Sequence, residues 1–322
     1  MPRGTLKAYL DFAPREEGFR DAALAGLRRT PKSIPCRFLY DRRGSALFEQ
    51  ICDLPEYYVT RAETAILTER AAEIASLIGP RCRLIEFGSG ASHKVRLLLN
   101  ALDQPLSYVP IDISGETLHQ AASAIAADFP ALDVVAVCAD YMEPRRLPAA
   151  VARPGGRRVG FFPGSTIGNL TPDEALEFLR GCHQLLGPGG GLIVGADLKK
   201  DPATLHAAYN DAAGVTAQFT LNLLERMNRE LDADFDLSRF EHEAFYNGPA
   251  GRVEIYIHSL MDQIVTVSGR RFMFARDERV HVEYSYKFSV DEFQALARRA
   301  GFKPVQCWTG AGLFGVHYLT VA

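Results

Sequence analysis

The chain has 322 residues, of which 47% are hydrophobic and 23% are charged, with a formal net charge of -3. This length predicts one large domain accompanied by a smaller one. The slightly negative net charge shows no excess of basic residues of the kind that binds nucleic acid or an anionic membrane. The sequence has no apolar run near the length of a membrane span, and its first residues lack the apolar region of a signal peptide. We therefore expect a cytoplasmic monomer that acts on a small molecule, with neither nucleic acid nor membrane as partner.

The cysteines and histidines indicate neither disulfides nor a metal centre. The six cysteines are scattered without a C-x-x-C pair, which is typical of free thiols in a reducing compartment. The eight histidines also show no spacing that resembles a metal site. We expect no bound metal.

Aromatic residues gather between Ile34 and Tyr58, beside glycine and proline. Apart from a short apolar-periodic stretch, Ala46–Ile51, the composition indicates a shaped loop rather than a core element. The aromatic side chains could line a binding site, or they could simply cover a sheet edge. From this stretch alone the second interpretation is favoured. The aromatic residues concerned are Tyr40, Phe48, Tyr57 and Tyr58.

A helix is predicted from Thr60, where Thr60 and Glu63 have the spacing of a capping box, to the stop at Gly79–Pro80. The next stretch, Arg83–Lys94, joins an apolar strand through a glycine-rich turn to the start of another helix. Such a turn places backbone N–H groups at the carboxyl end of a parallel strand, where a nucleotide can bind. His93 stands where a dinucleotide fingerprint has its third glycine. S-adenosylmethionine therefore fits better than a nicotinamide dinucleotide.

Two further predicted strands are followed by polar residues suited to the same nucleotide. Leu106–Asp112 ends in an acid placed to accept hydrogen bonds from ribose hydroxyls, although Asp112 could equally cap the next helix. Asp133–Cys138 leads to Asp140 and Tyr141, which could bind the adenine amine and cover the ring face. An ordinary surface pair would have the same pattern.

A fourth strand, Arg158–Phe162, leads into a loop with two glycines and the polar residues Ser165 and Asn169. The next helix is well capped by Thr171 and Glu174. A plain turn needs fewer residues, so this loop is expected to pass close to a ligand. The repeated strand–helix units predict a parallel sheet with helices on both faces.

The strand–helix rhythm then stops, and residues 201–231 are predicted to be helical. Alternating strands follow, of which the last is Val280–Phe288, so this block is an α+β insertion. Period two places Glu283, Ser285 and Lys287 on one face of that strand. The polar face could meet solvent or line a pocket, and the pattern leaves both alternatives open.

A helix capped by Ser289 and Glu292, followed by strands at 304–308 and 315–321, completes the chain. A helix and an antiparallel pair of this kind usually end a class I methyltransferase sheet. The predicted fold class is α/β, with a Rossmann-like class I methyltransferase sheet and a smaller α+β domain that binds the substrate.

Several strings, spread in order over nearly the whole chain, match one family. They are Tyr40–Ser45, Leu54–Tyr58, Thr60–Glu63, Glu86–Gly90, Gly164–Thr171, Gly214–Phe219 and Glu283–Phe288. In these strings the chain resembles the histidine Nα-methyltransferases of ergothioneine biosynthesis, which trimethylate L-histidine to hercynine with S-adenosylmethionine. The resemblance implies a methyltransferase domain at 61–200 and 288–322, and a substrate domain at 1–60 and 201–287.

The resemblance also implies the site residues, position by position. Those expected to bind the cofactor, and its product S-adenosylhomocysteine, are Gly88, Gly90, Lys94, Asp112, Asp140, Tyr141 and Ser165. Those expected to bind L-histidine are Phe48 and Tyr57, Asn169 and Tyr209 at the carboxylate, and Glu283 and Ser285 at the imidazole. Tyr40 and Asn169 are expected at the α-amine that is methylated.

The resemblance also implies that relatives which methylate other amino acids, such as prenylated tryptophan, differ at the positions expected to contact the imidazole. The presence of Glu283 and Ser285 therefore favours histidine. The alternative is the same fold acting on the amine of another amino acid or derivative. His93 argues against a nicotinamide-dependent dehydrogenase, and the intact set of site residues argues against a non-catalytic binding protein.

Overall fold

The computed structural model of the chain describes residues 4–12, 18–90, 93–142 and 155–322, so residues 91 and 92 of the expected glycine turn lie outside the described residues. The chain divides into two compact units. Unit 1 comprises Met1–Pro14, Ala62–Leu198 and Phe288–Ala322, and unit 2 comprises Arg15–Arg61 and Lys199–Lys287. The boundaries expected from the sequence placed residues 1–60 together, whereas the N-terminal strand belongs to unit 1.

Unit 1 contains an eight-stranded sheet in the order β1-β5-β4-β3-β6-β7-β14-β13. The strands from β1 to β7 are parallel neighbours, and β14 and β13 complete the sheet in antiparallel fashion. This is the predicted α/β fold class. The bounds are β1 (Ala8–Asp11), β3 (Arg83–Phe87), β4 (Ser107–Asp112), β5 (Asp133–Cys138), β6 (Arg158–Phe162), β7 (Gly191–Asp197), β13 (Phe302–Gly310) and β14 (Phe314–Val321).

The strand order reverses at β3, because β4 and β5 follow on one side of it while β6 and β7 follow on the other. In open parallel sheets a ligand binds at the carboxyl ends of the strands beside such a reversal. The short strand β1 was not predicted. It pairs with β5, with Ala8 opposite Val135, and so places the N-terminal segment at the edge of this sheet.

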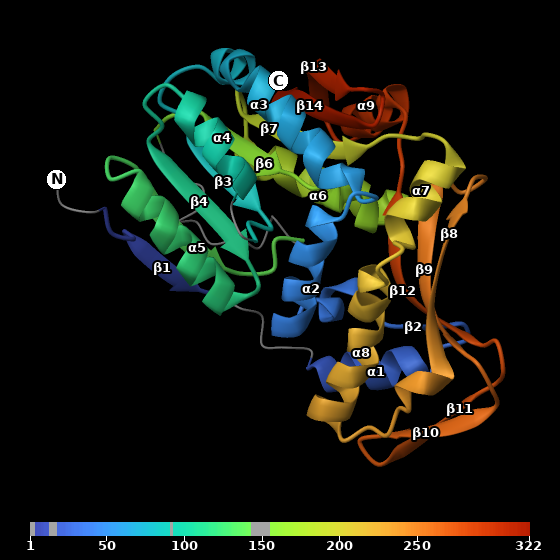
Figure 1. Ribbon diagram of the computed structural model, residues 1–322. Coiled ribbons are helices and arrows are strands. Elements are labelled where there is room, and N and C mark those ends of the chain that lie inside the picture. Colours follow the sequence, from blue (N-terminus) through green and yellow to red (C-terminus); the bar gives the residue numbers. More distant parts are fainter. Residues whose placement is uncertain (1–3, 13–17, 91–92, 143–154) are drawn as a thin grey trace. The chain divides into compact units, whose positions relative to one another are not determined.

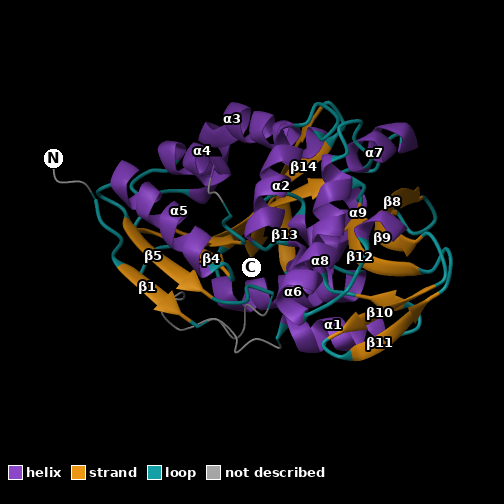
Figure 2. Ribbon diagram, turned by 60° about the horizontal axis from the view of Figure 1, so that its bottom comes forward, coloured by secondary structure: helices purple, strands orange, loops and turns teal. Residues whose placement is uncertain are grey.

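Helices cover both faces of the sheet of unit 1 (Figures 1 and 2). On one face lie α3 (Tyr58–Ile78), α4 (His93–Ala101) and α5 (Gly115–Asp128). On the other, α6 (Pro172–Leu186) and α9 (Val290–Arg299) pack together over the buried core of the strands. Both of these helices begin with the predicted capping boxes, Thr171 with Glu174 and Ser289 with Glu292.

The capping box predicted at Thr60 is absent from α3. The helix begins earlier, at Tyr58, so Thr60 lies inside it. The Glu63 side chain is fully buried and binds partners far away in the sequence, as described below. A capping box is a local pattern, and here long-range burial determines where the acid points.

Unit 2 contains a four-stranded sheet in the order β2-β12-β9-β8 and a separate hairpin of β10 and β11. In the sheet, β2 runs parallel to β12, and the other neighbours are antiparallel. The bounds are β2 (Lys32–Ser33), β8 (Phe240–Asn247), β9 (Arg252–Ser259), β10 (Gln263–Val267), β11 (Arg270–Phe274) and β12 (Arg279–Tyr286).

The helical elements of unit 2 differ from the prediction in two places. The segment interpreted as a shaped loop contains the 3-10 turn η1 and the helix α2, so that interpretation was wrong. The predicted helical stretch at 201–231 is two helices, because Asp211 accepts the N–H groups of Val215 and Thr216, both at 2.8 Å, and starts a new helix there. The bounds are α1 (Phe19–Leu27), η1 (Cys36–Leu39), α2 (Arg42–Asp53), α7 (Pro202–Tyr209), α8 (Val215–Leu231) and η4 (Leu237–Arg239).

Within the residues that the structure describes, no helix combines the length and the apolar character needed to cross a membrane. The same residues contain no group of three His, Cys, Asp or Glu side chains that could hold a metal ion. The six cysteines are free thiols.

Candidate active site

In unit 1, the glycine turn is hydrogen-bonded to the acid that ends β4. Gly88 and Gly90 have φ angles of 71° and 46°, in the left-handed region that favours glycine. Asp112 Oδ2 accepts the Gly90 N–H at 3.1 Å, and its Oδ1 accepts the Ser114 N–H at 2.9 Å. Asp112 thus shapes the glycine turn and also the local turn before α5, whose N-cap is Ser114. Each carboxylate oxygen has a second lone pair, so Asp112 can still accept from ribose hydroxyls.

Tyr141 lies against the same turn. A Cβ atom on Gly88 would be 3.2 Å from carbons of the Tyr141 ring, so the ring approaches the backbone as closely as glycine allows. Asp140, beside it, accepts the Met142 N–H at 2.9 Å in a local turn after β5. The ends of β3, β4 and β5 therefore bring Gly88, Asp112 and Tyr141 together. Their nucleotide-binding roles stay predictions.

A buried acid joins Lys94 to the loop after β6. The carboxylate of Glu63, on α3, accepts hydrogen bonds from Lys94 Nζ and from the Gly164 N–H, the latter at 2.8 Å and 3.1 Å to its two oxygens. It also lies against β7, because a Cβ atom on Gly195 would be only 2.1 Å from Glu63 Oε1. Glycine at 195 thus permits the close approach of the carboxylate. Glu63 links three elements of unit 1 at one point.

The loop after β6 is also fixed to the end of β7. Ser165 has a φ of 57°, and its Oγ accepts the Asp197 N–H at 2.9 Å in the protein interior. This bond uses the Ser165 oxygen as an acceptor and leaves its O–H as a donor for the predicted cofactor contact. Asn169 closes the 3-10 turn η3 (Thr166–Asn169) of the same loop and is half-buried.

Glu86, near the end of β3, is buried and accepts the O–H of Tyr108. Burial raises the pKa of Glu86 to about 8, although the Tyr108 bond and the charge of Lys94 act in the opposite direction. The carboxyl group is therefore mostly protonated at neutral pH, and in that form it can donate a hydrogen bond.

In unit 2, the predicted aromatic site residues form one cluster. Tyr40 packs edge-on against Phe48 at 5.5 Å between ring centroids, and Phe48 against Tyr57 at 6.3 Å. Tyr57 packs edge-on against Tyr209 at 6.2 Å. Phe219 of α8, which was not predicted as a site residue, contacts both Tyr40 and Phe48. Such edge-to-face pairs stabilise a cluster beyond its buried area.

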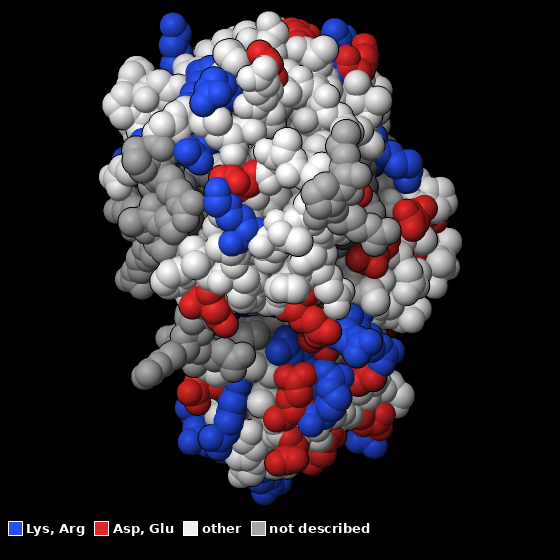
Figure 3. Space-filling view, turned by 90° about the vertical axis from the view of Figure 1, so that its left-hand side faces the viewer, with Lys and Arg blue, Asp and Glu red and all other residues white. Residues whose placement is uncertain are grey.

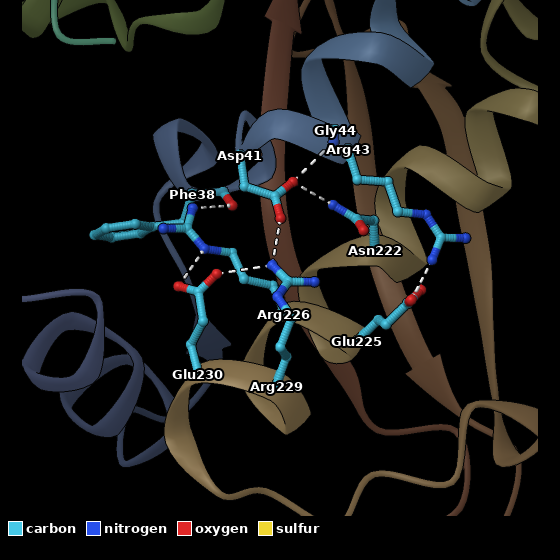
Figure 4. Close-up of polar contacts among 9 residues, drawn as sticks. All are labelled: Phe38, Asp41, Arg43, Gly44, Asn222, Glu225, Arg226, Arg229 and Glu230. Atoms are coloured by element: carbon cyan, nitrogen blue, oxygen red, sulfur yellow. Dashed lines mark hydrogen bonds and ion pairs between the residues drawn. The ribbon is translucent and has the colours of Figure 1, made fainter. Parts of the chain in front are cut away.

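A polar network fixes Asp41 and the start of α2 against α8 (Figure 4). Asp41, next to Tyr40, is the N-cap of α2 and accepts the Gly44 N–H at 2.8 Å. The same carboxylate accepts from Asn222 Nδ2 at 2.7 Å and from Arg229 at 2.6 Å, both on α8. The start of α2 is therefore held by its cap and by a neighbouring helix, which fixes the backbone beside Tyr40.

Glu283 and Ser285 of β12 and Lys287, the residue after its end, form a polar face that is buried and does not meet solvent. Glu283, Ser285 and Lys287 are exposed by only 8%, 5% and 2%. Lys287 Nζ lies 2.8 Å from Tyr209 Oη and 2.7 Å from Ser285 Oγ, and these two hydroxyl oxygens are 2.8 Å apart. Burial raises the pKa of Glu283 to about 7, and the charge of Lys287 acts in the opposite direction.

The structure thus groups the predicted residues within each unit. Three residues with central contacts in these groups were not predicted as site residues, namely Glu63, Phe219 and Lys287. All three lie in the strings that carried the family resemblance. Their place in these strings was the only sign in the sequence that they belong to the site, but the strings alone do not say which of their residues are buried together.

Comparisons with known proteins identify the family of the chain. The model of the family described as histidine-specific, SAM-dependent methyltransferase matches residues 19–321. A histidine N-alpha-methyltransferase of Mycolicibacterium smegmatis is 42% identical over 97% of this chain and 98% of its own, and one of Mycobacterium tuberculosis is 42% identical over 91% of each. Ergothioneine biosynthesis protein 1 of Neurospora crassa is 32% identical over 90% of this chain, which spans 33% of that longer protein. The chain belongs to the histidine-specific, S-adenosylmethionine-dependent methyltransferase family.

Proposed function

We propose that the chain transfers methyl groups from S-adenosylmethionine to the α-amine of L-histidine, giving Nα,Nα,Nα-trimethylhistidine (hercynine) for ergothioneine biosynthesis. The observation that carries this proposal is the buried polar face of β12, where Glu283 and Ser285 stand two residues apart. A carboxylate accepts from a ring N–H, and a hydroxyl can donate to the other ring nitrogen. The two mycobacterial relatives, both named histidine N-alpha-methyltransferases, support the same substrate.

The glycine turn of unit 1 fits the nucleoside part of the cofactor. Gly88 carries no Cβ beneath the Tyr141 ring, and Asp112 has acceptor sites for ribose hydroxyls. Asp140 is proposed to bind the adenine amine. The set is completed by Gly90, Lys94 and Ser165. The bound cofactor supplies a methyl group already activated on a sulfonium, so the protein has mainly to bind, orient and exclude water.

The residues of unit 2 are proposed to hold the amino acid. Glu283, Ser285 and Tyr57 would surround the imidazole, while Phe48 would pack on its face. Tyr209, together with Asn169 of unit 1, is proposed to bind the carboxylate by hydrogen bonds.

Tyr40 and Asn169 are proposed to orient the α-amine, and the Tyr40 hydroxyl can pass the proton that the amine loses to an ordered water. The faces of tyrosine rings also stabilise the positive charge that grows on the amine as methyl groups are added.

The test is a methylation assay coupled to calorimetry. With S-adenosylmethionine, L-histidine should yield its mono-, di- and trimethylated forms in mass spectra. Histamine, which lacks the carboxylate, should be a poor substrate because buried polar groups would lose their partner. Efficient turnover of tryptophan without turnover of histidine would overturn the assignment in favour of another amino acid.

We also propose that the enzyme works as a cytoplasmic monomer on a free amino acid, without nucleic acid or membrane. The formal net charge is -3, and basic and acidic side chains are interspersed on the face drawn in Figure 3. Free cysteines suit a reducing compartment. Light scattering during gel filtration should give the mass of one chain, and a dimer mass at micromolar concentration would contradict the proposal.

A further inference from the structure

Lys287 forms a hydrogen-bonded triangle with two hydroxyl groups of unit 2. Its Nζ lies 2.7 Å from Ser285 Oγ and 2.8 Å from Tyr209 Oη, and the third side of the triangle measures 2.8 Å. Lys287 is 2% exposed and Ser285 is 5% exposed. Placing an ammonium group in the interior is costly unless its hydrogens are bonded. The two hydroxyls of the triangle therefore offset part of the cost of burying the Lys287 ammonium group.

The triangle restricts where the hydroxyl hydrogens can point. An ammonium group only donates, so both Tyr209 and Ser285 accept from Lys287. The bond between the two hydroxyls uses one of their two hydrogens. The other hydroxyl hydrogen therefore points outside the triangle. Lys287 thus converts a pair of groups that could each donate or accept into a unit that presents a donor.

The charge of Lys287 acts on both ends of the proposed substrate site. Tyr209, which is proposed to bind the carboxylate, is a neutral residue, and Lys287 Nζ lies 2.8 Å from its hydroxyl oxygen. A positive charge in the interior strengthens a hydrogen bond made to an anion. The same charge favours the ionised form of Glu283, which burial opposes.

Other charged residues on the strands beside β12 have partners of their own. Arg252 of β9 pairs with Glu254, at 2.8 Å. Lys32 of β2 pairs with Glu278.

We propose that Lys287 is a positioning residue of the histidine site, which orients the hydroxyls of Tyr209 and Ser285 so that one of them donates to the amino acid, and which supplies a positive charge beside them. This inference rests on the proposed function and deepens it. In this proposal Lys287 does not contact the substrate. Apart from its charge on Glu283, its effect passes through Tyr209 and Ser285, and that dependence can be measured.

The experiment compares Lys287→Met with Lys303→Met, a change of the same kind at an exposed lysine of unit 1. Calorimetry with S-adenosylhomocysteine present should show histidine Kd raised about tenfold to a hundredfold in Lys287→Met, and unchanged in Lys303→Met. Histamine, without a carboxylate, should lose less affinity than histidine. The Kd of S-adenosylhomocysteine alone should change less than twofold.

A double-mutant cycle separates positioning from general structural damage. In a Tyr209→Phe/Ser285→Ala background, Lys287→Met should raise histidine Kd by less than about threefold, because the hydroxyls through which it acts are gone and only its charge on Glu283 remains. A full tenfold effect in that background would overturn the proposal, and so would a wild-type Kd in Lys287→Met. If Lys287→Met does not fold, Lys287→Gln replaces it, and unchanged histidine binding there would be equally fatal. Failure of wild type to bind or methylate histidine would instead overturn the proposed function.

Discussion

Replacing Glu63 by glutamine should weaken cofactor binding, because this buried carboxylate holds both Lys94 and the loop that begins at Gly164. Glutamine keeps one oxygen for the Gly164 N–H but loses the charge that faces Lys94. A hydrogen bond to a charged group contributes about 1.5–3 kcal/mol and a neutral one about 0.5–1.5 kcal/mol. The difference is about 1–2 kcal/mol, which corresponds to a rise in Kd of about five- to thirtyfold.

The assay is calorimetry with S-adenosylhomocysteine on wild type, Glu63→Gln and the control Glu69→Gln. Glu69 lies on the same helix, α3, but its side chain is 70% exposed, so its replacement should leave Kd unchanged. Thermal unfolding of each variant without ligand measures the cost to the fold. Loss of thermal stability in Glu63→Gln together with a wild-type Kd would refute the reasoning, because Glu63 would then support the fold without positioning the cofactor site.

Three further outcomes are expected. Glu283→Ala should lower the ratio of kcat/KM for histidine to that for tryptophan, and an unmoved ratio would remove Glu283 from the imidazole site. Burial raises the pKa of Glu86 in the folded protein to about 8, so wild type should lose stability as pH rises from about 4.5 to about 8. Glu86→Gln has no such carboxyl group, so its stability relative to wild type should increase over this range. Urea unfolding at pH 5 and pH 8 measures the gain, and an equal difference at both pH values would contradict it. Asp41→Ala should lower the free energy of unfolding at pH 7 by about 0.5–2 kcal/mol through loss of the cap. Burial raises the pKa of Asp41, but its hydrogen bonds outweigh this and hold the pKa below its usual value. The free energy of unfolding lost in Asp41→Ala should therefore shrink as pH falls below about 4. A loss at pH 3 equal to that at pH 7 would argue against the network.

Patterns that depend on near neighbours were predictable from the sequence. The capping boxes that start α6 and α9 are present because both partners lie within one turn. The strands β5 and β6 have the predicted bounds, since each is a short run of mostly apolar residues closed by turn residues. The prediction at Thr60 was wrong for the complementary reason. Glu63 has the spacing of a cap, but its partner Gly164 is 101 residues away in the chain.

The polar face of β12 shows where prediction from a pattern stops. Period two correctly placed Glu283, Ser285 and Lys287 on one face, but a strand pattern contains no information about what covers that face. Tyr209 at the end of α7 contributes a hydroxyl to it across 76 residues of sequence. The pattern left open whether this face meets solvent or is covered, and only a tertiary contact such as that of Tyr209 decides between the two.

Lys94, which is half-buried, and Lys287, which is buried, have partners of different chemistry, and the difference suits the two proposed ligands. Lys94 is paired with the carboxylate of Glu63, so its charge is compensated inside unit 1. Compensation lowers the repulsion that a bare ammonium would exert on a cationic sulfonium. Lys287 instead donates to two neutral hydroxyls, and its charge also favours the ionised form of Glu283, whose pKa burial raises. A positive charge behind hydroxyl donors suits the anionic carboxylate of an amino acid. We therefore propose that the same residue type faces a cation in one unit and an anion in the other, with the difference set by the chemistry of the groups to which each lysine donates.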